Sequence, residues 1–274
     1  MSTSLQPSQS SFAHRFDLWW QFTVRAVELR HRGSYLGFVW MVLNPLLMLG
    51  LYVTVFGFIF GGNFGQLPDE TPWDYAMGVF LGLIVFHLLA EAISTAPQFI
   101  VGNPNFVKKV VFPLEILPLA NIGAYCFHFA VSVVLLLIGG LLIGHPFTLA
   151  GFLWLPVIVL PHVLLCIGLG WLLAALGVFF RDIVQITTFV SLVILYASAV
   201  FYSPETVQST TPDLWTILKW NPVLHTIDLA RKALLWHQPI ELLNLGYTWL
   251  CGLVMCVIGW IVFRTSRPAF GDVL

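Results

Sequence analysis

The chain has 274 residues, of which 58% are hydrophobic and only 9% are charged. Because about a quarter of the residues in a soluble domain are charged, this composition excludes an ordinary water-soluble fold and indicates a membrane protein with several spans. The formal net charge of −1 gives no electrostatic basis for binding nucleic acid.

The first patterned segment, residues 12–32, predicts an amphipathic helix. Arg25, Glu28 and Arg32 lie opposite an apolar stripe made of Phe12, Phe16, Trp19, Trp20, Val24 and Val27. Such a helix lies in the membrane interface, and two roles remain open for it, a simple anchor and a part of a gate. The polar residues before it contain no apolar run, so we expect no cleavable signal peptide.

Six later windows are apolar and long enough to cross a bilayer, which takes about 20 residues for about 30 Å of hydrocarbon. They are residues 38–60, 75–94, 117–142, 152–178, 183–202 and 243–263. Gly144, His145 and Pro146 separate the third window from the fourth and predict a helical hairpin. The sequence therefore predicts an all-α polytopic membrane protein with six transmembrane helices in a single domain, residues 1–274.

The distribution of basic residues predicts the orientation. An even number of spans places both termini on one side, and nine of the 12 basic residues fall in segments on that side. Lys219, Arg231 and Lys232 fall on the other side. Since basic residues mark the cytoplasmic side, we expect both termini in the cytoplasm.

The cytoplasmic segment 97–118 is too apolar to be only a tether. Pro104 and Pro113 interrupt it, and Lys108 and Lys109 lie among Phe106, Val107, Val110, Val111 and Phe112. Apolar side chains beside positive charge suit a docking surface for another protein. A positive-inside anchor explains the same composition equally well.

The outer segment, residues 203–242, is also unusually apolar for a loop. It contains three helix-start signals, in which a capping residue precedes proline: Ser203-Pro204, Thr211-Pro212 and Asn221-Pro222. These signals predict short helices before the last span. Re-entrant helices that line a pathway and a small lid on the headgroups remain alternatives.

Polar groups inside the apolar windows are scarce. Glu91, one turn after His87, is the only carboxylate inside a predicted span, and an ion pair with a neighbouring cation explains it better than a proton relay. His162 and Cys166 share a helix face, but two ligands do not make a zinc site. No lysine follows glycine, so the chain lacks a nucleotide-binding loop.

Aromatic residues make up 15% of the chain. Tyr52, Phe56 and Phe60 recur at four-residue spacing on one face of the first span, where their rings could stack on sugars that pass through a pore. Interfacial belts and helix packing explain most membrane aromatics and remain the alternative. The candidate channel aromatics are Trp40, Tyr52, Phe56, Phe60, Phe189, Tyr196 and Tyr202.

Several strings, in this order, resemble the membrane subunit of ABC-2 type exporters of lipid-linked polysaccharides. They are residues 30–40 running into Asn44-Pro45, residues 105–113 followed by Ile116-Leu117-Pro118, Phe180-Arg181-Asp182, and Ser203-Pro204 followed by Asn221-Pro222 and Arg231. The resemblance implies a homodimer in the cytoplasmic membrane. It also implies two copies of a separate ATPase that bind ATP and magnesium, so that this chain needs no cofactor and is not itself an enzyme.

The resemblance also implies a role for each group of residues. Asn105, Phe106, Lys108, Lys109, Phe112 and Pro113 would couple the chain to the ATPase. Arg30, Arg32, Arg181 and Asp182 would form an inner gate near the lipid pyrophosphate, and Pro204, Asn221, Pro222 and Arg231 would form a re-entrant exit. Leu114 departs from the family, which usually carries a basic or polar residue there.

The implied mechanism is that ATP closes the partner subunits and the paired first and fifth spans separate, which opens an aromatic-lined channel for the glycan. Three rival functions remain open. They are an ABC-2 exporter of a drug or lipid, an ion-coupled carrier and an intramembrane enzyme. The few charges within the spans leave little to couple an ion gradient, which favours the exporter.

Overall fold

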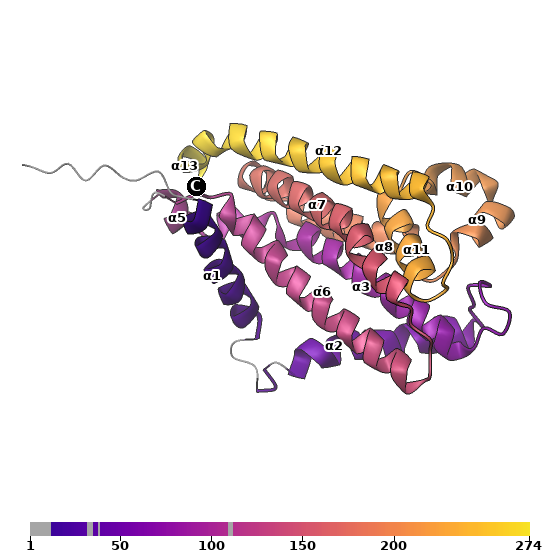
Figure 1. Ribbon diagram of the computed structural model, residues 1–274. Coiled ribbons are helices and arrows are strands. Elements are labelled where there is room, and N and C mark those ends of the chain that lie inside the picture. Colours follow the sequence, from indigo (N-terminus) through magenta and orange to yellow (C-terminus); the bar gives the residue numbers. More distant parts are fainter. Residues whose placement is uncertain (1–11, 32–34, 38, 109–111) are drawn as a thin grey trace, which may run out of the picture.

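The computed structural model describes residues 12–31, 35–37, 39–108 and 112–274, and within them all regular secondary structure is helical (Figure 1). The elements are α1 (Phe12–His31), α2 (Val39–Tyr52) with its π-helical continuation η1 (Val53–Ile59), α3 (Pro72–Thr95), α4 (Gln98–Val101), α5 (Pro104–Lys108), α6 (Ile116–Leu142), α7 (Leu149–Phe179), α8 (Ile183–Ala197), α9 (Pro204–Thr210), α10 (Pro212–Leu218), α11 (Pro222–Leu234), α12 (Leu242–Ser266), the 3-10 turn η2 (Arg267–Ala269) and α13 (Phe270–Val273).

A helix lies in each of the six apolar windows, and five of these helices are long and apolar enough to cross a membrane. The exception is α8, whose 15 residues rise about 22 Å at 1.5 Å each. It ends at Ala197 rather than at Tyr202, because the backbone turns at Ala199, where φ is 55°. The fifth window therefore contains a short helix followed by a compact turn.

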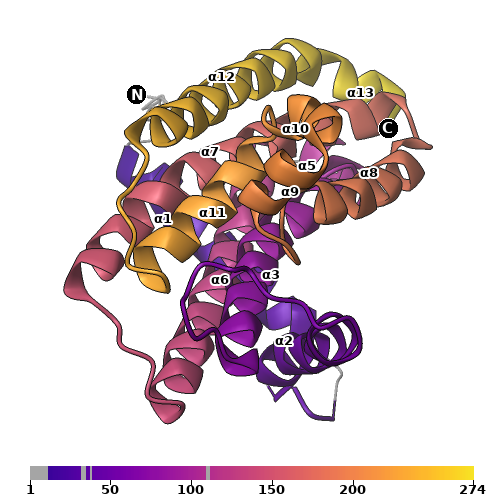
Figure 2. The ribbon, with the colours of Figure 1, turned by 90° about the vertical axis from the view of Figure 1, so that its right-hand side faces the viewer.

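The helix α3 lies at the centre of the fold. It packs against α6, α7, α8 and α11, and 89% of its most apolar window is buried. By contrast α2, continued by η1, has no buried residue among those described. Figure 2 shows α2 and α12 at opposite margins of the molecule, with α3, α6 and α7 between them.

Glycines allow α7 and α12 to pack closely along their lengths (Figure 1). A Cβ atom on Gly259 would lie 2.0 Å from the carbonyl oxygen of Gly168. A Cβ on Gly168 would in turn lie 2.3 Å from the carbonyl oxygen of Met255. Small residues at such contacts let two backbones approach, which is how membrane helices gain van der Waals contact without a hydrophobic driving force.

Local sequence rules explain most helix boundaries. Pro204, Pro212 and Pro222 each begin a helix as predicted, and the side chains of Ser203 and Asn221 cap theirs, whereas that of Thr211 makes no capping hydrogen bond. The predicted hairpin break also holds, because α6 ends at Leu142 and Gly144 turns the chain with φ of 75°. The next helix, α7, then begins after Thr148, whose side chain accepts a hydrogen bond from the Gly151 amide.

The two ends of the molecule carry different elements. One end holds α5, η2, α13 and the start of α1, and the chain terminates there (Figure 1). The opposite end holds α9, α10, α11 and the loop after η1, where Gln66 donates to Glu205 at 3.2 Å. The described coupling residues of α5 lie at the first end, and the predicted exit residues of α9 and α11 lie at the second.

Candidate functional site

An aromatic cluster joins η1 to the turn after α8. Phe56 stacks on Phe201 with ring centroids 4.4 Å apart and an interplanar angle of 16°, and Tyr52 lies 4.9 Å from the same ring. Phe60 continues the stack 6.0 Å from Phe56, and the Tyr196 ring lies 6.0 Å from Phe201. The structure thus brings three of the seven predicted channel aromatics onto one buried ring, Phe201, which is not among the seven, and a fourth, Phe60, onto Phe56.

The other three predicted aromatics lie differently. The Tyr202 hydroxyl donates to the carbonyl oxygen of Tyr196 at 2.6 Å, which ties the turn to the last residues of α8. Phe189 lies on α8 and is 66% exposed. Trp40 lines a separate cavity with Arg30 and Glu91. Neither Phe189 nor Trp40 has a ring contact in the cluster among the described residues.

Arg231 holds the turn that positions Phe201. Its side chain is fully buried, with Nε donating to the Gly78 carbonyl at 2.9 Å. Its two terminal nitrogens donate to the carbonyls of Ala199 and Val200, each at 2.6 Å. The Ala199 and Val200 carbonyls lie in the turn that follows α8, whereas the Gly78 carbonyl lies inside α3. Arg231 therefore connects α3, α8 and α11 at one point.

The other predicted exit residues also stabilise this end of the fold. The Asn221 side-chain amide donates to the Ala197 carbonyl and to the Ser198 hydroxyl, both at 3.0 Å. Its oxygen accepts from the Val223 amide and so caps α11, which begins at Pro222. Pro204 is buried at the start of α9. The hydrogen bonds of Asn221 thus fix the start of α11 relative to the end of α8.

At the opposite end, the predicted coupling residues divide into two groups. Phe106 and Phe112 lie 4.9 Å apart and both pack on Phe22 of α1, at 5.5 and 5.0 Å. Asn105 and Lys108 are exposed, whereas Pro113 is half-buried and Lys109 lies outside the described residues. The phenyl rings therefore link this segment to α1, and Asn105 and Lys108 remain available to a partner.

The C-terminal residues close over the same segment. Arg267 donates to the Phe112 carbonyl at 3.2 Å and pairs with Glu115 at 3.3 Å. A cavity of about 440 Å³ lies between the segment and this C-terminal turn, with Leu114 in its lining. Leu114 is buried and belongs to the hydrophobic core.

The predicted inner-gate residues do not form a single described cluster. Arg30 makes a bidentate ion pair with Glu91, with Nη1 donating to Oε2 at 2.7 Å. This confirms the interpretation of Glu91 as the partner of a neighbouring cation. The hydrogen bond to Glu91 outweighs burial and raises the pKa of Arg30. Arg181 and Asp182 lie exposed in the turn between α7 and α8, and Arg32 lies outside the described residues.

The candidate zinc ligands belong to the packed interior. His162 is buried, and its Nε2 lies 3.0 Å from the Val85 carbonyl oxygen. Cys166 is buried beside it in α7. Among the described residues, no group of three or more His, Cys, Asp and Glu is placed to hold a metal ion.

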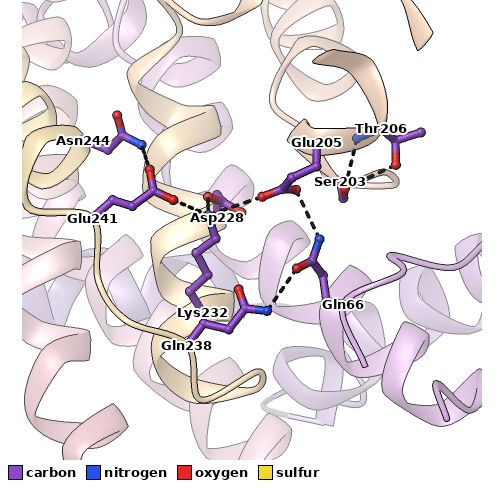
Figure 3. Close-up of polar contacts among 9 residues, drawn as sticks. All are labelled: Gln66, Ser203, Glu205, Thr206, Asp228, Lys232, Gln238, Glu241 and Asn244. Atoms are coloured by element: carbon purple, nitrogen blue, oxygen red, sulfur yellow. Dashed lines mark hydrogen bonds and ion pairs between the residues drawn. The ribbon is translucent and has the colours of Figure 1, made fainter. Parts of the chain in front are cut away.

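A charged network that the sequence analysis missed lies between α9, α11 and the start of α12. Figure 3 shows three carboxylates directed at Lys232, whose Nζ lies 2.8 Å from Asp228, 2.7 Å from Glu241 and 3.4 Å from Glu205. Burial opposes the charge on Lys232, but the carboxylates outweigh it and raise its pKa. The i,i+4 spacing of Asp228 and Lys232 was the one sequence signal for this network.

Comparisons with known proteins identify a family model and several relatives. The family model described as "ABC-2 type transporter" matches residues 17–235. An O-antigen export system permease protein, RfbA, of Klebsiella pneumoniae is 22% identical over 265 residues, 96% of this chain and 97% of the relative. An RfbA of Myxococcus xanthus is 29% identical over 90% of this chain and 92% of the relative. The polysialic acid transport protein KpsM of Escherichia coli is 24% identical over the same shares.

The family match covers most of the chain, including α2, α3, the segment around α5 and the short helices α9 to α11. The relatives extend the similarity to nearly the full length. This protein is a member of the ABC-2 type transporter family and a helical membrane component of the permease type.

Proposed function

We propose that this chain is the transmembrane subunit of an ATP-driven exporter that moves a lipid-linked polysaccharide across the cytoplasmic membrane. Two copies form the channel, and two copies of a separate ABC ATPase supply the energy. The observation that carries the proposal is similarity over nearly the whole chain to permeases named for O-antigen and polysialic acid export. Both termini lie in the cytoplasm in this arrangement.

The described surface near α5 supports a docking role. Asn105 and Lys108 are exposed, while Phe106 and Phe112 connect their backbone to Phe22 of α1. A displacement of the segment around α5 would therefore be transmitted to α1 through these ring contacts and not only through the connecting backbone. In the proposed mechanism, ATPase closure moves α5 and α1 together and changes the inner gate.

The aromatic cluster supports a glycan path along α2 and α8. Tyr52, Phe60 and Tyr196 keep exposed surface around the buried ring of Phe201. Aromatic faces make weak contacts with many sugars, which suits a polymer that must slide. In the proposed arrangement α8 is the short fifth span, and the turn held by Arg231 forms the outer end of this path.

Purification from native membranes through a tag on this chain tests the proposal. We expect an ABC ATPase and a lipid-linked saccharide to accompany it. A drug or lipid substrate in place of the saccharide would contradict the glycan assignment. Uphill transport by liposomes that contain this chain alone would contradict the need for an ATPase.

Arg181 gives a residue-level test of the inner gate. Its guanidinium is exposed and suited to bidentate contact with phosphate oxygens. Arg181→Ala should lower export in cells about tenfold, the loss of one charge-assisted contact, while the ATPase still co-purifies. Arg25→Ala, which removes an exposed arginine from α1, is the matched control. Normal export by the Arg181 variant would remove this residue from the gate.

A further inference from the structure

A cavity of about 660 Å³ lies at the α9–α11 end of the molecule, between α9, α10, α11 and the start of α12. Its lining combines three aromatic side chains, Trp215, Trp220 and Tyr247, with the carboxylates of Glu205, Asp228 and Glu241. This volume is within the range of pockets that hold small organic molecules. The cavity is separate from the aromatic cluster around Phe201 and from the coupling segment.

Asp228 has an unused hydrogen-bond acceptor in this lining. The residue is 4% exposed, and its Oδ2 lies 2.8 Å from Lys232 Nζ. Its Oδ1 is buried and has no hydrogen-bond partner among the described residues. Since a buried carboxylate oxygen without a donor is costly, this atom needs a donor that the described residues do not supply.

The charge around this atom favours a cation. Glu205, Asp228 and Glu241 surround the ammonium of Lys232 (Figure 3), and the buried guanidinium of Arg231 also acts on Asp228, so three carboxylates face two cations and an excess of negative charge remains. A second basic residue in the lining, Lys219, instead lies over the ring of Trp220, 5.6 Å from its centroid. The cavity thus offers carboxylates at one part of its lining and an ammonium at another.

An apolar surface continues from the cavity along α12. Leu242, Leu243 and Leu250 belong to the lining and are 68%, 86% and 61% exposed. The exposed face of the same helix continues through Leu253, Val257 and Ile261. Because α12 is long and apolar enough to span a membrane, this face is suited to an acyl chain, and Trp220 and Tyr247 in the lining are of the residue types enriched at membrane interfaces.

We propose that this cavity binds the headgroup of a membrane phospholipid that carries a primary ammonium, such as phosphatidylethanolamine. The ammonium donates to Asp228 Oδ1, Lys219 pairs with the phosphate, and an acyl chain lies along α12. A trimethylammonium headgroup cannot donate this hydrogen bond, and a glycerol headgroup lacks the positive charge. The site therefore selects among lipids of equal chain composition, and its existence does not depend on which substrate the protein exports.

Native mass spectrometry of the protein, purified with its partner subunits, tests the site by titration with phosphatidylethanolamine, phosphatidylcholine and phosphatidylglycerol of identical chains. We expect the first lipid to bind about tenfold more tightly than the other two, the value of one charge-assisted hydrogen bond. Asp228→Asn should remove this preference. Asp213→Asn, an equal charge change at an exposed position of α10 outside the lining, should keep it.

A second variant tests whether loss of lipid binding in Asp228→Asn results only from impaired folding. Trp220 is 65% exposed, so Trp220→Ala should leave thermal unfolding unchanged and still weaken phosphatidylethanolamine binding severalfold. Equal binding of the three lipids by the unmodified protein would overturn the proposal. So would loss of a co-purified saccharide, with lipid selectivity intact, in Asp228→Asn, because that result would assign the cavity to a sugar.

Discussion

The helices α2 and α3 have nearly the same mean hydropathy but opposite surroundings. None of the most apolar window of Val39–Ile59 is buried, whereas 89% of that of Pro72–Thr95 is buried. Hydropathy therefore indicates that both belong in a membrane but does not identify their neighbours. The protein's own helices cover α3, and α2 keeps its surface for lipid or for another chain.

The contacts that cover α3 explain this difference. Arg231 bonds the Gly78 carbonyl from one side, and a Cβ atom on Gly82 would lie only 2.5 Å from an Arg231 nitrogen. On α2, a Cβ on Gly50 would meet nothing within 4 Å. The glycines of α3 are therefore places of close approach, while Gly50 faces open space. Point substitutions can test this contrast directly.

Arg231→Ala should give the largest effect. The substitution removes the buried donor of the Gly78, Ala199 and Val200 carbonyls, and each buried acceptor left unsatisfied costs about 1–3 kcal/mol. Thermal unfolding of the detergent-purified protein measures the loss. Arg181→Ala, which removes an exposed guanidinium, should change unfolding little. An Arg231 variant as stable as the parent would show that α3 is held mainly by apolar packing.

A matched pair of leucines tests the burial contrast itself. Leu81 of α3 is fully buried, and Leu47 of α2 is 56% exposed. Leu81→Ala should lower the free energy of unfolding by about 2 kcal/mol, the lower end of the range for buried leucines, since the membrane supplies no water-transfer term. Leu47→Ala should change it by less than about 0.5 kcal/mol. Equal losses in the purified protein would mean that a second copy covers α2 under those conditions.

The sequence predicts where the helices of this fold begin and end better than it predicts which helices pack against one another. The starts of α9, α10 and α11 follow from local capping rules at Pro204, Pro212 and Pro222, and the hairpin break follows from Gly144. These rules depend on neighbours within one turn. The environment of α2 depends instead on which helices pack beside it, and no local pattern reports that.

The same limit applies to the candidate sites. Tyr52 and Phe56 were predicted from their spacing, and their rings do lie together. Phe201 became their common partner only because Arg231, 30 residues later in the chain, holds the turn that carries it. Similarly, the i,i+4 spacing of Asp228 and Lys232 can be recognised in the sequence. Their neighbours Glu205 and Glu241 belong to other segments, so no local pattern predicts that they pair with Lys232.

Phe56 tests a connection between the α2–η1 helix and the turn that follows α8. Its ring stacks on Phe201, whereas Phe58, two residues later on the same element, is 66% exposed. Phe56→Ala should therefore cost more than about 1 kcal/mol, because one aromatic pair contributes about that much beyond the apolar area that it buries. Phe58→Ala should cost less than Phe56→Ala in the same unfolding measurement. A larger loss of stability in Phe58→Ala would mean that the exposed face of η1 packs against a partner in the purified protein. The contrast in burial between α2 and α3 would then hold for a single chain but not for the assembled transporter.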